Sequence, residues 1–239
     1  IVIQQFPWHD FRPVMMPPAY PTWLIPRFVW VCIFSAVVIA ACAAILLNIK
    51  AKAVSLILGV VLLLLVIVFQ ISGQPYPSHL GSWTDAFKEL ALSGGAFVVA
   101  GSLLQPGYTS VMEKFIPIGK YFFAITMTVF GYMHFLYPDF VATLVPNWIP
   151  GHLFWTYFAA VVLMAGGLGI ILNIKRRLAA NLLGITIFIW LIVLHIPRYI
   201  SYPLTNNGNE GTSVFEALAF SGIAFLIAGR PDKKKSECI

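Results

Sequence analysis

The sequence predicts an all-α integral membrane protein made of two tandem four-helix bundles in parallel orientation, with the first helix of the first bundle largely missing. Composition is the first reason: 59% of the 239 residues are hydrophobic and only 10% are charged, whereas about 25% of the residues of a soluble domain are charged. The mean hydropathy of +0.86 agrees with this. A soluble fold of this length needs a polar exterior that so few charges cannot supply, so the exterior must face lipid.

Long apolar segments are the second reason. A helix needs about 20 mostly apolar residues to cross the hydrocarbon core of a bilayer. Segments that meet this length without a single charge cover residues 28–47, 53–71, 153–172 and 178–196. A fifth segment, 121–137, contains His134 one turn from its end. These segments predict five membrane-spanning helices.

Two further segments, 90–104 and 214–228, are apolar but too short to cross a bilayer by themselves. We therefore expect both helices to begin earlier in the chain. Their first turns then take in the charged residues Asp85, Lys88, Glu89 and Glu216. We expect these charges at the membrane interface, where they are tolerated.

An internal repeat is the third reason. Residues 21–71 match residues 146–196 at a constant offset of 125, with 15 identities in 51 positions and no gap. The run Asn-Ile-Lys at 48–50 recurs at 173–175 within this match. After a short insertion the offset becomes 128, and it pairs Ser93 and Gly94 with Ser221 and Gly222, among others. Shared Trp, Pro, Asn and Gly at constant spacing indicate a duplication.

The repeat defines the domain organisation. His9 falls on His134 at the offset of 125, so the first residues are interpreted as the end of a first helix whose beginning is not in this sequence. An even number of helices per unit makes both units insert the same way up. We expect a first unit of three helices and a remnant, a joint, a second unit and a tail, over residues 1–105, 106–114, 115–230 and 231–239.

The distribution of Lys and Arg predicts the topology. Eleven of them fall on one side of the predicted spans, and four, namely Arg12, Arg27, Lys88 and Arg198, fall on the other. Because cytoplasmic loops of membrane proteins carry an excess of Lys and Arg, we expect an inner-membrane protein with a cytoplasmic C-terminus. The net charge of +6 therefore reports orientation and indicates no nucleic-acid partner.

Titratable side chains concentrate at the opposite, outer end. The candidate outer pocket consists of His134, His195, Arg198, Glu216, Trp148 and Trp155. Two histidines and a carboxylate can exchange protons with a quinone headgroup, and a polar cluster that only ties helix ends together explains them as well. The tryptophans are typical of interfacial anchors, or of an aromatic wall beside a quinone or lipid. We expect no bound metal here.

Catalytic motifs are absent from the sequence. Cys32 and Cys42 lie ten residues apart in one predicted helix, about 15 Å along its axis, which is too far for a disulfide. The sequence also contains no Gly-rich nucleotide loop, no G-x-S-x-G and no H-E-x-x-H. This favours a protein that is not an enzyme on its own.

The second unit resembles the DoxX-like family of small four-helix membrane proteins. Gly-Tyr-Met-His-Phe-Leu-Tyr-Pro-Asp-Phe at 131–140, Pro-Asn-Trp-Ile-Pro at 146–150 and Arg-Leu-Ala-Ala at 177–180 carry the resemblance. It covers about residues 115–229, and the first unit is similar to the family more weakly. The resemblance implies one four-helix bundle per unit and association with membrane redox assemblies. The duplication and the lack of paired cysteines depart from the family pattern.

Three functions are compatible with these observations. The first is a non-catalytic membrane subunit that docks a membrane or extracytoplasmic redox partner through its outer loops. The second is a subunit of a quinone-binding oxidoreductase, with the quinone near His134, His195, Arg198 and Glu216. The third is a small-solute transporter, although the predicted span centres carry no charge and no Pro-interrupted helix. Membrane lipids are expected partners in every case.

Overall fold

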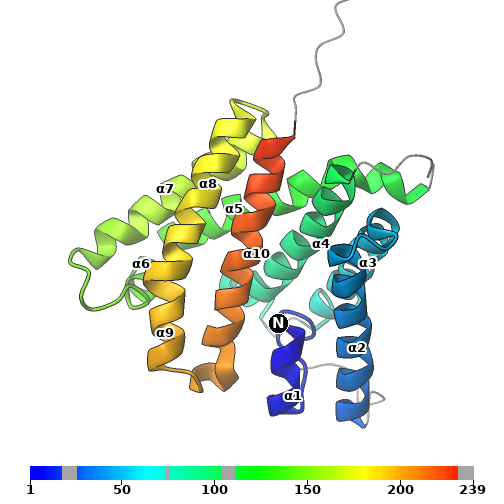
Figure 1. The fold of residues 1–239 in the computed structure, drawn as a ribbon. Coiled ribbons are helices and arrows are strands. Elements are labelled where there is room, and N and C mark those ends of the chain that lie inside the picture. Colours follow the sequence, from blue (N-terminus) through cyan, green and yellow to red (C-terminus); the bar gives the residue numbers. More distant parts are fainter. Residues whose placement is uncertain (18–25, 74–75, 104–110, 231–239) are drawn as a thin grey trace, which may run out of the picture.

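The computed structural model describes residues 1–17, 26–73, 76–103 and 111–230 (Figure 1). Helices make up 81% of the structure, and no strand occurs in the described ranges. The long helices are α2 (Arg27–Leu46), α3 (Ala51–Leu65), α4 (Thr84–Ser102), α5 (Ile116–Leu136), α7 (His152–Ile171), α8 (Arg176–Trp190) and α10 (Asn209–Gly229). Two π-helices, η3 (Val66–Gln70) and η6 (Leu191–His195), extend α3 and α8, and η6 leads into α9 (Ile196–Ser201). The short elements are η1 (Val2–Gln4), α1 (Gln5–Trp8), η4 (Leu80–Trp83), η5 (Val111–Phe115), α6 (Pro138–Ala142) and η7 (Thr205–Gly208).

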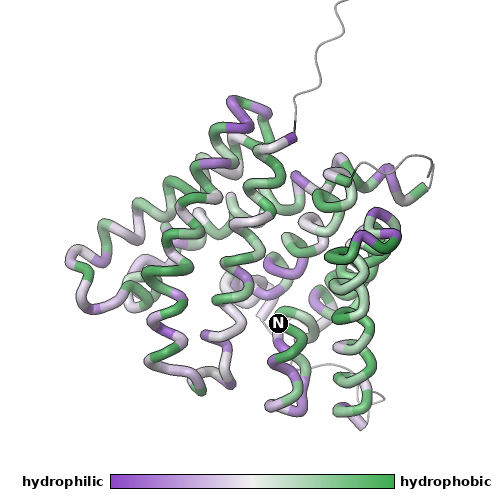
Figure 2. The backbone as a smooth tube through the Cα atoms, in the orientation of Figure 1, coloured by the Kyte–Doolittle hydropathy of each residue, from purple (hydrophilic) through white to green (hydrophobic). Residues whose placement is uncertain are grey.

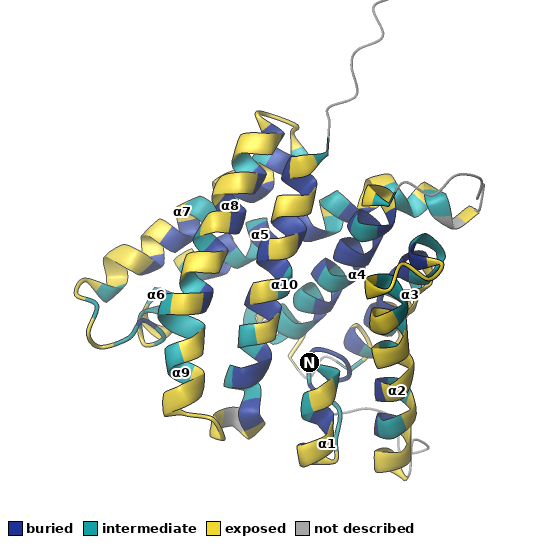
Figure 3. Ribbon diagram, viewed as in Figure 1, coloured by how far each residue is buried: buried dark blue, intermediate teal, exposed yellow. Residues whose placement is uncertain are grey.

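Six helical segments are long and apolar enough to cross a membrane, which confirms an all-helical, multi-pass membrane protein in outline. They comprise α2, α3 with η3, η5 with α5, α7, α8 with η6 and α9, and α10. Green, hydrophobic residues cover most of their length in Figure 2. Their outward faces are exposed, as Figure 3 shows for α2, α7 and α8, and these faces therefore suit contact with lipid.

The remaining long helix, α4, lies at the centre of the fold. Its first two turns carry Asp85, Lys88 and Glu89, and it packs against α3, α5 and α10. Gly94 of α4 faces Gly119 of α5 so closely that a Cβ atom on either would lie 2.5 Å from the carbonyl oxygen of the other. Only glycine permits this approach, and it brings α4 into backbone contact with α5.

The largest hydrophobic core lies among α4, α5, α7, α8 and α10. Fully buried members include Val98, Phe123, Ile170 and Leu183. A smaller core joins α3 to α4 through Leu56 and Phe97. Helix α2, which follows the N-terminal segment (residues 1–17), contributes little to the hydrophobic core, because Val31 and Ser35 are its only buried residues.

Several local features recur at the offset of the sequence repeat. The bounds of α2 and α7, of α3 and α8, and of the π-helices η3 and η6 each differ by 125 residues. The loops that precede α3 and α8 also share a conformation, because Asn48, Lys50, Asn173 and Lys175 all have positive φ angles of 42° to 57°. A π-helix is a rare element. Two of them at equivalent positions therefore show that the match extends from the residue types to the backbone.

One interhelical contact is also repeated. The hydroxyl of Ser93 in α4 donates to the carbonyl oxygen of Gly59 in α3 at 2.7 Å, and the hydroxyl of Ser221 in α10 donates to that of Gly184 in α8 at 2.9 Å. Both serines and both glycines are matched by the repeat. The pair α3–α4 is therefore built like the pair α8–α10. Much of the joint at 106–114 and the whole tail at 231–239 lie outside the described residues.

Candidate functional site

An ion-pair cluster joins the N-terminal half of α4 to the N-terminal half of α10. The ammonium of Lys88 lies 3.0 Å from a carboxylate oxygen of Glu216 and 3.4 Å from one of Asp85. Asp85 and Lys88 are three residues apart in α4, so they lie on the same face of the helix. The side chains of Lys88 and Glu216 are only 13% and 4% exposed. Lys88 and Glu216 therefore form a buried ion pair between two helices, although the two residues are 128 positions apart in the sequence.

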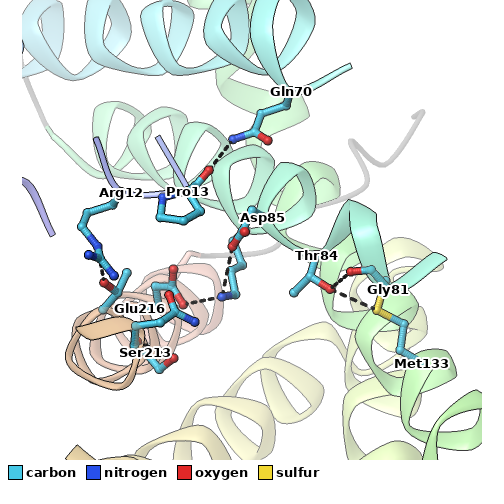
Figure 4. Close-up of polar contacts among 12 residues, drawn as sticks. Arg12, Pro13, Gln70, Gly81, Thr84, Asp85, Met133, Ser213 and Glu216 are labelled. Atoms are coloured by element: carbon cyan, nitrogen blue, oxygen red, sulfur yellow. Dashed lines mark hydrogen bonds and ion pairs between the residues drawn. The ribbon is translucent and has the colours of Figure 1, made fainter. Parts of the chain in front are cut away.

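Arg12 brings the N-terminal segment into the same cluster (Figure 4). The residue is 2% exposed, and its Nε donates to the hydroxyl of Thr212 in α10 at 3.0 Å. Its Nη1 donates to the carbonyl oxygen of Asn207 at 2.6 Å. Burial lowers the pKa of the Arg12 guanidinium from its usual value, and the nearby Glu216 carboxylate opposes this shift. Arg12 and Lys88 thus both contribute positive charge around Glu216.

Amide side chains extend the cluster away from the charges. Gln4 accepts a hydrogen bond from the Thr212 hydroxyl at 3.2 Å. Gln70, at the end of the π-helix η3, donates to the carbonyl oxygen of Pro13 at 2.9 Å. Gln5 accepts from the hydroxyl of Ser35 in α2 at 3.1 Å. The N-terminal segment is therefore fixed between α10, α2 and η3 by hydrogen bonds of buried side chains.

The formal charges of Arg12, Asp85, Lys88 and Glu216 sum to zero when all four are ionised. A buried carboxylate or ammonium is stable only if its charge is compensated. The cluster meets this condition by pairing groups from the N-terminal segment, α4 and α10. Chemically it fixes three segments in one arrangement and presents no nucleophile beside a general base.

The sequence-predicted pocket residues do not form one hydrogen-bonded group within the described part of the chain. The Nδ1 atom of His134 lies 2.7 Å from the carbonyl oxygen of Phe130, one turn earlier in α5. Arg198 makes a two-point ion pair with Glu210, at 2.7 Å and 3.1 Å. Glu216 pairs with Lys88. Each of these three side chains thus has its partner outside the predicted set.

The other members of the predicted pocket lie in different surroundings. His195 is the last residue of the π-helix η6 and is half-buried. Trp148 is 68% exposed, and Trp155 is 39% exposed and packs edge-on against the rings of Phe154 and Phe158 in α7. Both tryptophans are in positions suited to the membrane interface.

Arg12, Asp85 and Lys88 are the members of the ion-pair cluster that the predicted pocket did not include. A signal for Lys88 exists, because Lys88 and Glu216 occupy equivalent positions of the repeat and have opposite charges. No pattern in the sequence indicates Arg12, because it lies in an irregular segment. Its contact with Thr212 spans 200 residues of chain.

A pocket of about 350 Å³ lies beside the cluster, between the N-terminal segment and the chain that connects α9 to α10. Its lining includes Gln4, Trp8, Tyr199, Leu204 and Gly208. None of the sequence-predicted pocket residues lines it. In the described ranges, no group of three or more His, Cys, Asp or Glu side chains is arranged to hold a metal ion.

Comparison with known proteins finds a match to a family model. Residues 123–214 match the model of a family described as a domain of unknown function, DUF8561. The matched stretch runs from within α5 to the start of α10, so it covers most of the second unit. No curated protein and no solved structure matches the chain. The resemblance to the DoxX-like family thus stays a prediction from the sequence.

Proposed function

We propose that the protein is a non-catalytic integral membrane subunit that docks a redox partner at its outer end. The proposal rests on one observation: the charged groups at the outer end are paired with other groups of the same chain. Lys88 pairs with Glu216, Arg198 pairs with Glu210, and Arg12 bonds to α10. Groups that are committed to fixing helices shape a surface, whereas a catalytic centre needs groups that are free to react.

The proposed architecture is two units of the same topology, inserted in parallel and related by an axis along the membrane normal. The equal offsets of α2 and α7, of α3 and α8, and of the two π-helices support it. So does the repeated Ser-to-Gly hydrogen bond. The excess of Lys and Arg on one side supports placement in the inner membrane with the C-terminus in the cytoplasm.

The outer end has apolar side chains suited to docking. Phe140, Trp148, Ile200 and Leu204 are 66% to 74% exposed, and they belong to the loops and short helices at that end. The redox nature of the partner is supported only by the DoxX-like resemblance of the second unit. The partner that this surface fits is a membrane or extracytoplasmic protein with a complementary apolar patch.

Co-purification tests the proposal. The tagged protein is extracted from native membranes in a mild detergent, and the proteins that elute with it are identified by mass spectrometry. The double variant Phe140→Ser, Trp148→Ser should elute with less partner while staying monodisperse. Ile185→Ser is the matched control, because Ile185 is 47% exposed in the middle of α8, away from the outer end. Equal recovery of partner with both variants would contradict the proposal.

A quinone-binding subunit is the second candidate, and the pocket of about 350 Å³ favours it. Trp8 and Tyr199 offer rings to a planar headgroup, and Gln4 offers an amide. This volume falls at the lower end of the range for small-molecule sites, which is about 300–1,000 Å³. Mass spectrometry of lipid extracts from the purified protein would detect a retained quinone. Tyr199→Ala should then lower its amount, whereas the docking variants above should not.

A further inference from the structure

The two equivalent helices α4 and α10 differ sharply in how their matched faces are covered. Gly94 and Gly101 of α4 face neighbouring chain, because a Cβ atom on Gly94 would meet Gly119 and one on Gly101 would meet Ile116. Their counterparts at the offset of 128 are Gly222 and Gly229 of α10. A Cβ atom on either of these would meet no atom of the described residues within 4 Å.

The phenylalanine next to these glycines shows the same difference. Phe97 of α4 is fully buried and stacks on the ring of Phe115, with a second ring contact to Phe122. Its counterpart Phe225 is 41% exposed. The residues that cover α4 here come from α5 and the turn before it. In the part of the chain that the structure describes, no residue covers the equivalent face of α10 at Gly222.

A matching difference separates α2 from α7. Gly167 of α7 is buried against Ala124 and Thr128 of α5. Its counterpart at the offset of 125 is Cys42 of α2, which is exposed. Only 11% of the most apolar window of α2 is buried, against 39% for α7. The helix that α7 packs on thus has no equivalent beside α2 over most of the length of α2.

The uncovered faces of α2 and α10 are equivalent to the faces of α7 and α4 that pack against α5. Helix α5 lies between α7 of its own unit and α4 of the first unit, and these are its most extensive contacts. Ile1 is equivalent to Thr126 at the offset of 125, so residues 1–8 correspond to late turns of α5. The early part of α5, Ile116 to Ile125, has no counterpart within residues 1–239 at this offset. Gly94 and Gly101 meet Ile116, Gly119, Phe122 and Phe123 of that part, and Gly101 also meets Arg230 beyond the end of α10.

The contacts of the N-terminal segment show where such a helix would continue. The Ser35 hydroxyl lies 3.4 Å from the carbonyl oxygen of Val2, which places η1 against α2. Gln4 contacts α10 through Thr212. Figure 1 shows α1 between the ends of α10 and α2 accordingly. An established interface with both helices therefore runs directly into the two uncovered faces.

We propose that one further transmembrane helix covers these faces, running antiparallel to α2 between α2 and α10 and leading directly into η1. Its source is the same polypeptide, N-terminal to residue 1. It is the first-unit equivalent of α5, and a small residue opposite Gly222 would let the two backbones approach as Gly94 and Gly119 do. The proposal rests on the parallel tandem arrangement proposed above, but not on the docking role.

Photo-crosslinking in native membranes tests the proposal. The natural gene, with its full reading frame, is expressed with p-benzoylphenylalanine in place of Phe225. Irradiation should join this position to a peptide N-terminal to Ile1, as tryptic mass spectrometry would show. Phe188 of α8 is the matched control, because it is 43% exposed on a lipid-facing helix and should give lipid adducts. Lipid adducts at both positions, or an adduct to a different protein at 225, would overturn the proposal.

Glycine substitution gives a second, independent measurement. Gly94→Leu should lower the midpoint of thermal unfolding, because its side chain would separate α4 from α5. If a helix covers Gly222, Gly222→Leu should lower the midpoint by a similar amount. A Gly222→Leu midpoint equal to that of the unchanged protein would overturn the proposal. Loss of the docking partner would leave both measurements unchanged, so the two proposals fail separately.

Discussion

Removing the charge of Glu216 should destabilise the protein more than removing the charge of Glu210. Glu216→Gln keeps the size of the side chain but leaves Lys88 with Asp85 as its remaining ion-pair partner, at 3.4 Å. Breaking a buried ion pair by removing one partner costs about 3–5 kcal/mol. Because Asp85 stays in place, we expect the lower end, about 3 kcal/mol. For a chain of this length that corresponds to a decrease in Tm of about 6–12 °C.

The assay is thermal unfolding of the purified protein in one detergent, followed by circular dichroism and by size-exclusion chromatography of heated samples. Glu210→Gln is the matched control, because Glu210 lies in the same helix and its pair with Arg198 is less buried, with side chains that are 12% and 20% exposed. We expect this variant to lose about 1 kcal/mol, since partly solvated ion pairs contribute little. The difference between the two variants measures the effect of burial.

A double variant separates the ion pair from a general loss of packing. Lys88→Met with Glu216→Leu replaces both buried charges by apolar side chains of similar size, and such replacements are often neutral. Asp85 is 34% exposed and can then be solvated. We expect a Tm near that of the unchanged protein. A Glu216→Gln variant with an unchanged Tm would refute the reasoning. So would a double variant whose loss of stability equals the sum of the losses of the single variants Lys88→Met and Glu216→Leu.

Two further predictions concern the repeated contact between α3 and α4 and between α8 and α10. Gly59→Leu should reduce the yield of folded protein more than Gly184→Leu, because the new Cβ atom would lie 2.6 Å from the Phe97 ring but 3.0 Å from the Phe225 ring. Phe97 is fully buried and cannot move aside, whereas Phe225 is 41% exposed, and detergent-solubilised yield measures the difference. Ser221→Ala removes a hydroxyl that donates to a helix carbonyl, which is worth about 0.6 kcal/mol, so its Tm should fall by only about 1–2 °C.

The apolar spans and the repeat could be predicted because both can be recognised from the order of residue types along the chain. A run of 20 apolar residues needs no knowledge of its neighbours, and an offset of 125 is visible before any folding. The role of α4 was harder to predict, because its charged first turns resemble an interfacial helix end. The structure places Glu89 at 0% exposure, enclosed by neighbouring helices. Burial of this kind depends on which helices meet, and sequence alone does not specify that.

The candidate site was predicted only in part for the same reason. Glu216 was included because it is ionisable near the start of its helix, and it does belong to the buried cluster. His134 shares that location in sequence, but its ring bonds to its own helix at Phe130. Arg12 was not included, because its burial depends on an irregular segment that folds back onto α10. Partners of side chains at helix ends are decided by tertiary contacts.

The proposed tandem arrangement gives the Lys88–Glu216 pair a physical meaning. The two residues are equivalent, so in a symmetric pair of identical units this position would meet a second copy of itself. Two like charges buried 3.0 Å apart would repel strongly, so a symmetric pair could not place an ion pair there. Joining the units in one chain lets the two positions differ. Two further equivalent positions of the repeat also carry different residues, namely Glu89 with Ala217 and Gln70 with His195. In the proposed tandem arrangement the polar cluster therefore depends on the difference between the two units, and a single unit could not form it.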